Sequence, residues 1–234
     1  MDVAHQTSAK EAVGIYAAQL VLDGMNVGLG TGSTTAFAIQ ELGRRIQTEG
    51  LSIRGVPTSF AAERLARKLK IPLATLDEVA HLDIALDGAD EVDPHLNLIK
   101  GRGGAHTREK IVAALATEFV ALVDASKLVA QLGSVKPVPV EVLPMAVTPV
   151  MRALEQLGST EMQIRMGQKK DGPVVTDQGF WIVDAHFGGI ENPNELNKAI
   201  HAIPGVLDHG LFINMTQRVL IAEVDGTIRT MEKG

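Results

Sequence analysis

Four carboxylates gather in the stretch LDIALDGADEVD, residues 82–93, where an apolar run ends. They are Asp87, Asp90, Glu91 and Asp93. A solvated turn, a metal loop and a pair of catalytic acids would all have such an acidic sequence. Two carboxylates held as close as Asp87 and Asp90 raise the pKa of one of them, which lets it carry a proton near neutral pH. We therefore take Asp87 and Asp90 as candidate acids and expect Glu91 and Asp93 to lie in a solvated turn.

The acidic stretch does not fit a calcium-binding loop. Such a loop needs acidic residues at positions 1, 3 and 5 and glycine at position 6. Counted from Asp87, position 3 is Ala89 and position 6 is Val92, so the pattern fails. Gly88 and Ala89, between the two candidate acids, leave room for a substrate against the backbone.

A hard-cation site remains open at this point. It would combine Asp87 and Asp90 with a later group such as His106 or Glu109. Lys100 lies in the same stretch of chain and would compete electrostatically with a bound cation. The sequence therefore favours a site that holds no metal.

A glycine-rich loop, GLGTGSTT at residues 28–35, follows one predicted strand and opens a predicted helix. Backbone N–H groups and hydroxyls at a helix N-terminus bind anions, a single phosphate above all. The dinucleotide fingerprint fails because Ser33 replaces its third glycine, and no P-loop sequence is present. A tight turn with a Ser or Thr cap explains the spacing equally well, so both interpretations stay open. For Thr58-Ser59, which repeats the arrangement, we favour the plain cap.

Three further charged residues follow predicted strands or open a predicted helix. Lys100 stands in the flexible sequence Lys-Gly-Arg-Gly-Gly, residues 100–104, and Lys127 ends the sequence Asp-Ala-Ser-Lys. Glu109 falls in the first turn of a helix, where favourable interaction with the helix dipole would by itself explain an acid. Together with the glycine loop and the two aspartates, these groups match an aldose–ketose isomerase that uses no metal.

The elements that must position these residues alternate between strand and helix. We expect strands at 25–29, 52–56, 73–76, 82–86 and 119–123, and helices at 8–22, from the glycine loop to 50, at 60–69 and at 107–117. This order predicts an α/β fold with a Rossmann-like, mostly parallel sheet flanked by helices. Ligands of such sheets bind at the carboxyl ends of the strands, where the candidate residues lie.

The sequence changes character near residue 130, which predicts a second domain. Within residues 133–205 we expect helices at 150–157 and 193–202 and strands at 162–165, 174–175 and 181–183. This is a smaller α+β, ferredoxin-like insert. Residues 1–132 and 206–234 would form the Rossmann-like catalytic domain, with final strands at 211–214 and 219–223 that return to its sheet.

Composition excludes several classes of protein. A net charge of −6, 3% aromatic residues and no block of Lys or Arg argue against a nucleic-acid surface. No cysteine is present, which removes disulfides, zinc–thiolate sites and cysteine nucleophiles. The N-terminal sequence has no signal-peptide pattern and no apolar run reaches about 18 residues, so we expect a cytoplasmic protein without a membrane segment.

At this point the chain resembles a known family, ribose-5-phosphate isomerase type A, over nearly its whole length. The resemblance is carried by GLGTGST at 28–34, DGADEVD at 87–93, KGRGGAHTREK at 100–110, DASK at 124–127, PVEVLPMA at 139–146 and IPGVLDHGLF at 203–212. It implies interconversion of D-ribose 5-phosphate and D-ribulose 5-phosphate through an enediolate, without a cofactor or a metal. It also implies a homodimer or homotetramer whose partner is a small sugar phosphate.

The resemblance implies a role for each matching position. Glu109 matches the base that moves a proton between C1 and C2, Asp87 and Asp90 match acids that handle hydroxyl protons and ring opening, and Lys100 matches the lysine beside the enediolate oxygen. The implied substrate-binding residues are Thr31, Gly32, Ser33, Thr34, Gly88, Ala89, Gly101, Arg102 and Gly103, with Lys127 and Lys10 as cations near the phosphate.

Two departures from the family pattern lie in residues 100–106, which we call the lysine loop. They are Arg102, where many members have glycine, and His106, where an apolar residue is common. Arg102 adds a donor beside the expected site. Effector-sensing modules and coenzyme A transferases share related folds. A sensor would not need Glu109 and Lys100 together, and we find no sequence suited to an acyl-CoA.

Overall fold

The computed structural model describes residues 3–223 and 225–233, and the chain divides into two compact units. The first unit comprises Met1–Ala89, Arg108–Leu128 and Met215–Gly234, and the second comprises Asp90–Thr107 and Val129–Asn214. Residues 90–107, 129–132 and 206–214, which the sequence analysis placed in the first domain, cluster with the second unit.

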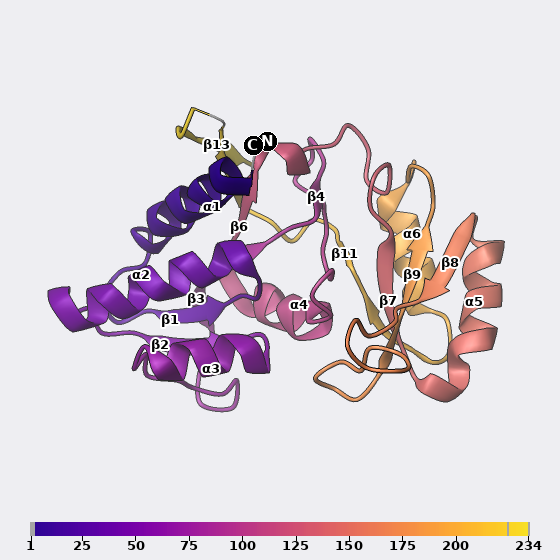
Figure 1. Ribbon diagram of the computed structural model, residues 1–234, viewed down its shortest axis with the longest axis horizontal. Helices are drawn as coiled ribbons and strands as arrows, with labels where there is room; N and C mark the ends of the chain where they lie inside the picture. The colour runs from indigo at the N-terminus through magenta and orange to yellow at the C-terminus, as the bar shows by residue number, and fades with distance from the viewer. Residues whose placement is uncertain (1–2, 224, 234) are drawn as a thin grey trace. The chain divides into compact units, whose positions relative to one another are not determined.

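The first unit is built on a six-stranded sheet with the order β13-β12-β6-β3-β1-β2 (Figure 1). The strands are β1 (Asn26–Leu29), β2 (Arg54–Pro57), β3 (Leu82–Gly88), β6 (Ala116–Asp124), β12 (Arg218–Ala222) and β13 (Ile228–Glu232). Every pairing is parallel except that of β12 with β13. The predicted α/β class with a mostly parallel sheet is confirmed.

One predicted strand of this unit, 73–76, is absent. Leu73 makes only an isolated parallel bridge to Gly55. After this bridge the N–H of Thr75 donates to the Glu78 carboxylate at 2.7 Å, and the Thr75 carbonyl accepts from the Glu78 N–H at 3.1 Å. The chain therefore turns away from the sheet edge.

Four helices flank the sheet: α1 (Val3–Ala18), α2 (Ser33–Glu49), α3 (Phe60–Lys68) and α4 (His106–Leu115). The main core joins apolar residues of α1 to α3 with strand residues such as Val27, Leu29, Ile84 and Leu86. Alternate residues of a strand point to opposite faces, so Gly28 and Ala85 belong to the other face. Helix α4 packs there, with Val112 against Gly28.

Gly28 decides how closely α4 approaches the sheet. A Cβ atom on Gly28 would lie 2.5 Å from Cγ1 of Val112 and 2.8 Å from Cβ of Ala85. Both distances are far below van der Waals contact, so a larger residue would displace the helix. Glu109 precedes Val112 by nearly one helical turn, and its position therefore depends on this glycine.

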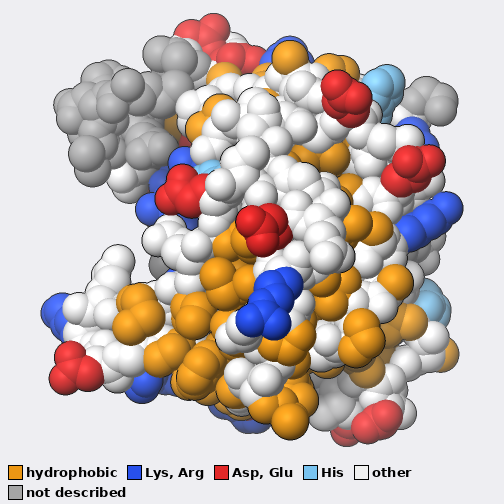
Figure 2. Space-filling model, turned by 90° about the vertical axis from the view of Figure 1, so that its right-hand side faces the viewer, with side chains coloured by type: hydrophobic (Ala, Val, Ile, Leu, Met, Phe, Trp, Pro, Cys, Tyr) orange, Lys and Arg blue, Asp and Glu red, His pale blue; other side chains and the backbone are white. Residues whose placement is uncertain are grey.

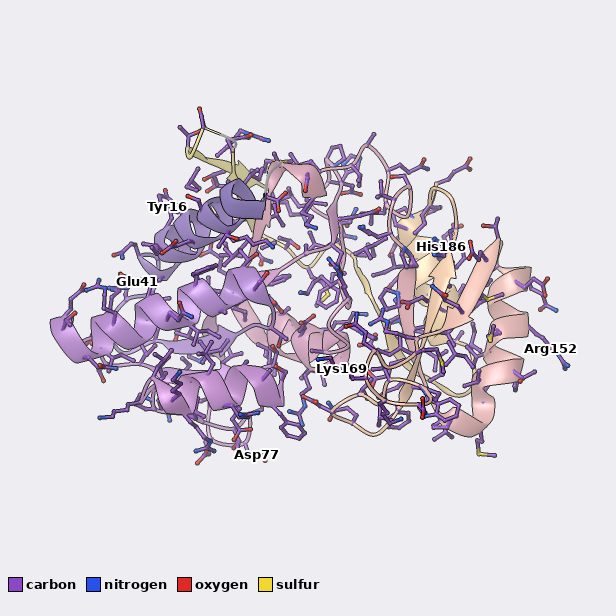
Figure 3. The ribbon with its side chains drawn as sticks, viewed as in Figure 1. Tyr16, Glu41, Asp77, Arg152, Lys169 and His186 are labelled. Carbon is purple, nitrogen blue, oxygen red and sulfur yellow. The ribbon has the colours of Figure 1, made fainter. Side chains whose placement is uncertain are left out.

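Ion pairs on the outer surface of α2 contribute little to this packing. Arg44 lies 2.6 Å from both Glu41 and Glu49, and Figure 3 labels Glu41 on this helix. The hydrogen bond from Arg44 holds the pKa of Glu41 below its ordinary value. Exposed pairs of this kind contribute at most about 1 kcal/mol, so the buried apolar residues dominate the stability of the unit.

The second unit contains a four-stranded antiparallel sheet with the order β10-β7-β9-β8 (Figure 1). Its elements are β7 (Val138–Val142), α5 (Val147–Gln156), β8 (Glu161–Ile164), β9 (Trp181–His186), α6 (Pro193–His201) and β10 (Val206–His209). Their order along the chain is β-α-β-β-α-β, and the fourth strand pairs with the first. This is the ferredoxin-like arrangement that the sequence predicted.

A three-stranded sheet completes the second unit: β4 (Glu91–Val92), β5 (Leu98–Ile99) and β11 (Leu211–Phe212). The sequence analysis expected residues 211–214 to return to the first sheet, and this was wrong. Leu211 and Phe212 pair instead with Ile99 and Leu98 of β5. The final strand prediction holds, because β12 pairs parallel to β6. Within residues 3–223 and 225–233, no helix is long and apolar enough to cross a membrane.

We expect Gly28→Ala to lower the free energy of unfolding by about 1 to 3 kcal/mol, the usual effect of overpacking, measured by urea denaturation. Gly50→Asn is the control. Gly50 has a φ of 75°, no described atom lies within 4 Å of the position that a Cβ would take there, and asparagine tolerates this left-handed conformation. A Gly28→Ala variant with an unchanged free energy of unfolding would contradict the role of close packing.

Candidate functional site

Asp87 lies at the carboxyl end of β3 with its carboxylate buried against the glycine loop. Its Oδ1 accepts hydrogen bonds from the N–H of Thr31 at 3.0 Å and of Gly88 at 2.8 Å. A Cβ atom on Gly30 would overlap the Asp87 carboxylate. Gly30 is therefore required by the aspartate, a packing reason that its place in the phosphate-type motif did not reveal.

Glu109 and Asp87 line one narrow crevice in the first unit, which is too small to hold a water molecule. Its other lining residues include Gly28, Gly30 and Thr58. Glu109 is buried and comes from the first turn of α4. A buried carboxylate beside a second carboxylate is an arrangement suited to proton transfer.

The glycine loop leads into an open helix N-terminus. Gly32 is the N-cap of α2, with a φ of 121°, and no side chain caps the helix there. Ser33 is exposed and Thr34 half-buried, so these residues and the first N–H groups of α2 are available to an anion. The alternative of a Ser or Thr cap does not describe this helix.

Thr31 has a different role from the rest of the loop. Its hydroxyl lies 2.8 Å from the hydroxyl of Thr58 and 2.7 Å from that of Ser59. Ser59 also caps α3 by accepting from the N–H of Ala62, so the expected plain cap is confirmed. Thr31 therefore ties the glycine loop to the start of α3.

Lys127 and Lys10, the two lysines expected near the phosphate, lie in the first unit. Lys127 ends a short 3-10 helix, Ala125–Lys127, directly after β6, and it is half-buried. Asp124 caps this turn by accepting from Ser126. Lys10 is half-buried on α1.

Gly88 and Ala89, which were expected to contact the substrate, follow Asp87 and are half-buried.

Lys100 follows β5 in the second unit and is only 3% exposed. Its N–H donates to the carbonyl of Gly210 at 2.9 Å. Its Nζ lies 5.4 Å from the centre of the Phe212 ring. The lysine is thus held by the chain that precedes and forms β11.

Asp90 lies beside the same strand. Its N–H donates to the carbonyl of Ile99 at 2.8 Å, and its Oδ2 accepts from the N–H of Arg102 at 3.0 Å. Arg102 is exposed and Gly101 is buried, with a φ of 106° at the glycine. Asp90 therefore orders the loop that follows Lys100.

Sequence reasoning missed a second support of this loop. The guanidinium of Arg165 donates to the carbonyls of Gly101 at 2.8 Å and Arg102 at 3.0 Å. It also pairs with the carboxylate of Asp184. A pocket of the second unit includes Asp90, Arg102 and Arg165 in its lining. Asp184 lies on β9 and Arg165 directly after β8, and no local motif marked them.

A buried carboxylate, Glu141, lies beneath the loop in the same unit. It accepts hydrogen bonds from the hydroxyls of Thr107 and Thr176. Burial raises the pKa of Glu141, although the two hydroxyls act in the opposite direction. His106 is fully buried, with Nε2 3.9 Å from Glu141 and its ring against Gly101. This departure from the family pattern therefore packs under the lysine loop.

Glu91 and Asp93 are not in a solvated turn, so that expectation was wrong. Glu91 is 1% exposed and accepts from the N–H groups of Gly133 at 2.6 Å, Val135 at 2.8 Å and Lys136 at 2.6 Å. Asp93 is also buried, and it accepts from the N–H groups of His95 and Asn97 and from the Asn97 side chain. Both acids satisfy backbone donors that no sequence pattern located.

The acidic stretch is poorly suited to a metal because its carboxylates already accept several hydrogen bonds. Elsewhere, His201, Asp208 and His209 are the one group of potential ligands that the described residues bring within 4.8 Å of one another. Leu211 N–H donates to Nδ1 of His209, which places that ring's proton on Nε2, 2.7 Å from Nδ1 of His201. Nε2 of His201 lies 3.1 Å from Asp208. The group is a hydrogen-bonded chain in which Nδ1 of each histidine already accepts a hydrogen bond.

The fold and these residues define a class of protein. It is an α/β protein whose candidate acids and lysine lie after strands or at the start of a helix, and which has an uncapped helix N-terminus suited to an anion. Comparison with known proteins identifies the family within this class. The family model of ribose 5-phosphate isomerase A (phosphoriboisomerase A) matches residues 54–226. The ribose-5-phosphate isomerase A of Thermosynechococcus vestitus is 60% identical over 225 residues, 95% of this chain and 95% of that protein. That of Methanosarcina acetivorans is 50% identical, covering 96% and 94%.

Solved structures agree. The enzyme from Methanocaldococcus jannaschii has a TM-score of 0.92 and 51% identity, covering 96% of this chain and 98% of that one. A D-ribose-5-phosphate isomerase in complex with phospho-erythronic acid has a TM-score of 0.93 and 44% identity, covering 96% and 97%. The chain belongs to the ribose 5-phosphate isomerase A family.

The buried carboxyl of Glu141 predicts a pH dependence. Its pKa lies above the ordinary 4.5, so the folded protein holds this proton more tightly than the unfolded chain. Its contribution to stability is therefore present at low pH and lost as the pH rises through the folded pKa. We expect the free energy of unfolding of the unmodified protein to fall relative to that of Glu141→Gln as the pH rises above the ordinary 4.5, measured by urea titrations.

Glu78→Gln is a control of opposite sign. The backbone N–H of Thr75, as the largest cause, and the Thr75 hydroxyl both donate to Glu78 and lower its pKa. The contribution of Glu78 to stability is therefore present at neutral pH and lost as the pH falls. If the free energy of unfolding of the unmodified protein instead rose with pH relative to that of Glu141→Gln, the raised pKa of Glu141 would be contradicted.

Proposed function

We propose that the chain interconverts D-ribose 5-phosphate and D-ribulose 5-phosphate, the reaction for which its family is named. The observation that carries this proposal is 60% identity to a ribose-5-phosphate isomerase A over 95% of both chains. The structural neighbour with phospho-erythronic acid binds a phosphorylated sugar acid, whose planar carboxylate resembles an enediolate. A sensor module or coenzyme A transferase is not favoured by these relatives.

Glu109 is the proposed base. Isomerisation removes a proton from C2 of the aldose and returns it to C1, which requires one group that accepts and then donates. A carboxylate does this when burial keeps it out of water and a rigid helix positions it. Glu109 is buried in the first turn of α4, and it lines the crevice together with Asp87.

Asp87 and Asp90 are proposed to transfer the hydroxyl protons and to assist opening of the sugar ring. Two N–H donors bind Oδ1 of Asp87 and so fix the plane of its carboxylate before a substrate arrives. Asp90 is fixed by the N–H of Arg102. Two acids in different settings can hold different protonation states, as alternating proton donors and acceptors must.

Lys100 is proposed to stabilise the enediolate oxygen. Negative charge grows on that oxygen only as the C–H bond breaks, so a fixed ammonium favours the transition state over the substrate. Gly101 and Gly103 let the backbone approach the same oxygen, and Arg102 places a further cation beside it.

The phosphate is proposed to bind at the N-terminus of α2. The uncapped N–H groups, the hydroxyls of Ser33 and Thr34 and the helix dipole all favour an anion there. Lys127 and Lys10 would add positive charge. Thr31 and Gly32 shape this loop.

Chain connectivity supports one reaction for all four charged residues. The chain passes from the first unit to the second between Ala89 and Asp90, and returns between Thr107 and Arg108. Asp87 and Asp90 flank the first passage, and Glu109 follows the second. Lys100 lies on the segment of chain between the two passages.

Assembly as a homodimer or homotetramer and a cytoplasmic location stay predictions. The second unit exposes large hydrophobic side chains, among them Leu143, Leu207 and Met145, the last 86% exposed. Figure 2 shows hydrophobic side chains across much of the side of the molecule that carries α5. Such a surface supports contact with a further protein chain.

We expect Glu109→Gln to bind ribose 5-phosphate with little change and to lose at least about a hundredfold in kcat, because the amide cannot accept the carbon-bound proton. A coupled assay for ribulose 5-phosphate formation measures kcat, and calorimetry measures binding. Glu63→Gln, on α3 and ion-paired with Arg67 at 2.8 Å, is the matched control and should keep full activity. Near-normal turnover by Glu109→Gln would remove the assigned base.

We expect dialysis against EDTA to leave kcat unchanged, because Asp87, Glu91 and Asp93 use their oxygens to accept protein N–H groups. The same coupled assay, with metal content measured by mass spectrometry, checks this. Activity that disappears on dialysis and returns with Mn²⁺ or Mg²⁺ would revive a metal site in the acidic stretch.

A further inference from the structure

Lys100 and Phe212 are diagonal neighbours on one face of the three-stranded sheet. Leu98 of β5 is opposite Phe212 of β11, and the Lys100 N–H donates to the carbonyl of Gly210. Alternate residues along a strand point to the same face. Lys100 and Leu98 therefore share a face with Gly210 and Phe212, and diagonal pairs of long side chains can touch across such a ladder.

Gly210 makes this contact possible. A Cβ atom on Gly210 would overlap the Lys100 carbonyl and lie 2.7 Å from Cδ of Pro139. No side chain fits opposite Lys100. The lysine side chain therefore meets Phe212, with Nζ 5.4 Å from the ring centre.

The contact matters because both partners are buried. Lys100 is 3% exposed and Phe212 0%. An ammonium is strongly hydrated in water, and burial removes most of that hydration. The face of an aromatic ring carries negative electrostatic potential and attracts a cation within about 6 Å of its centre. The packed ring cannot turn away, so it offers the ammonium a fixed partner.

We propose that Phe212 is a positioning residue for the isomerisation: its ring face fixes the Lys100 ammonium for stabilisation of the enediolate. This inference rests on the proposed role of Lys100. An ammonium that is already oriented need not reorganise when negative charge develops. Weakening the attraction should therefore lower kcat and leave KM nearly unchanged.

The test replaces Phe212 by 4-fluoro-, 3,5-difluoro- and 3,4,5-trifluorophenylalanine through site-specific incorporation. Fluorine withdraws electron density from the ring face while nearly keeping the ring's shape. We expect kcat to fall stepwise along the series, by roughly two- to thirtyfold in total, with KM within about twofold and a Tm that falls by no more than about 8 °C. The same series at Phe187, which packs on the core of the same unit, should leave kcat unchanged.

A Lys100→Met background separates this inference from the proposed function. Lys100→Met should be slow, and fluorination at 212 should then have no further effect on its kcat. Normal turnover by Lys100→Met would overturn the role of Lys100 itself. A slow Lys100→Met variant combined with a flat fluorination series would overturn only the role of Phe212. An equal fall of kcat in both backgrounds would assign the effect to packing and also overturn the proposal.

Discussion

The structure depends on positions where the backbone has no room for a side chain. Gly28, Gly30 and Gly210 are three such positions, and each lies beside a charged residue or the helix that carries one. Without a Cβ at Gly28, α4 packs on the sheet and brings Glu109 into the crevice with Asp87. At Gly30 and Gly210 the same absence leaves space for the Asp87 carboxylate and the Lys100 backbone. Close packing against bare backbone fixes these positions more rigidly than flexible surface contacts would.

Buried acids of this chain serve two purposes that their sequences do not distinguish. Glu91 and Asp93 accept several hydrogen bonds each, mainly from the backbone, and hold loops of the second unit together. Asp87 also accepts from backbone N–H groups, but it lies in a crevice with a second acid. A carboxylate becomes suited to chemistry when it faces a cavity and a partner that shifts its protonation, and the surrounding segments decide this.

Much of the fold could be predicted because its signals are local. Hydrophobic periodicity and glycine punctuation predicted the helices that became α2, α3 and α6, and the strand–helix alternation predicted the parallel sheet. The strand expected at 73–76 failed because Thr75 bonds to Glu78 in a turn and not to the sheet. Residues 211–214 were assigned to the wrong sheet because a short apolar run does not name its partner strand. Arg165, Asp184 and Glu141 were missed because each acts through residues distant in sequence.

The sequence by itself determined the family, the alternation of strand and helix, and the residue types that isomerisation needs, since motif spacing is a property of the chain alone. Only the tertiary structure decided which glycine makes room for which side chain, that Ser59 caps α3 while Gly32 leaves α2 open, and that Glu91 and Asp93 are buried. These outcomes depend on distances between segments far apart in sequence. In the DGADEVD stretch all four acids accept backbone N–H groups. Asp87 alone of the four lies in the crevice with Glu109, and Asp90 orders the loop after Lys100.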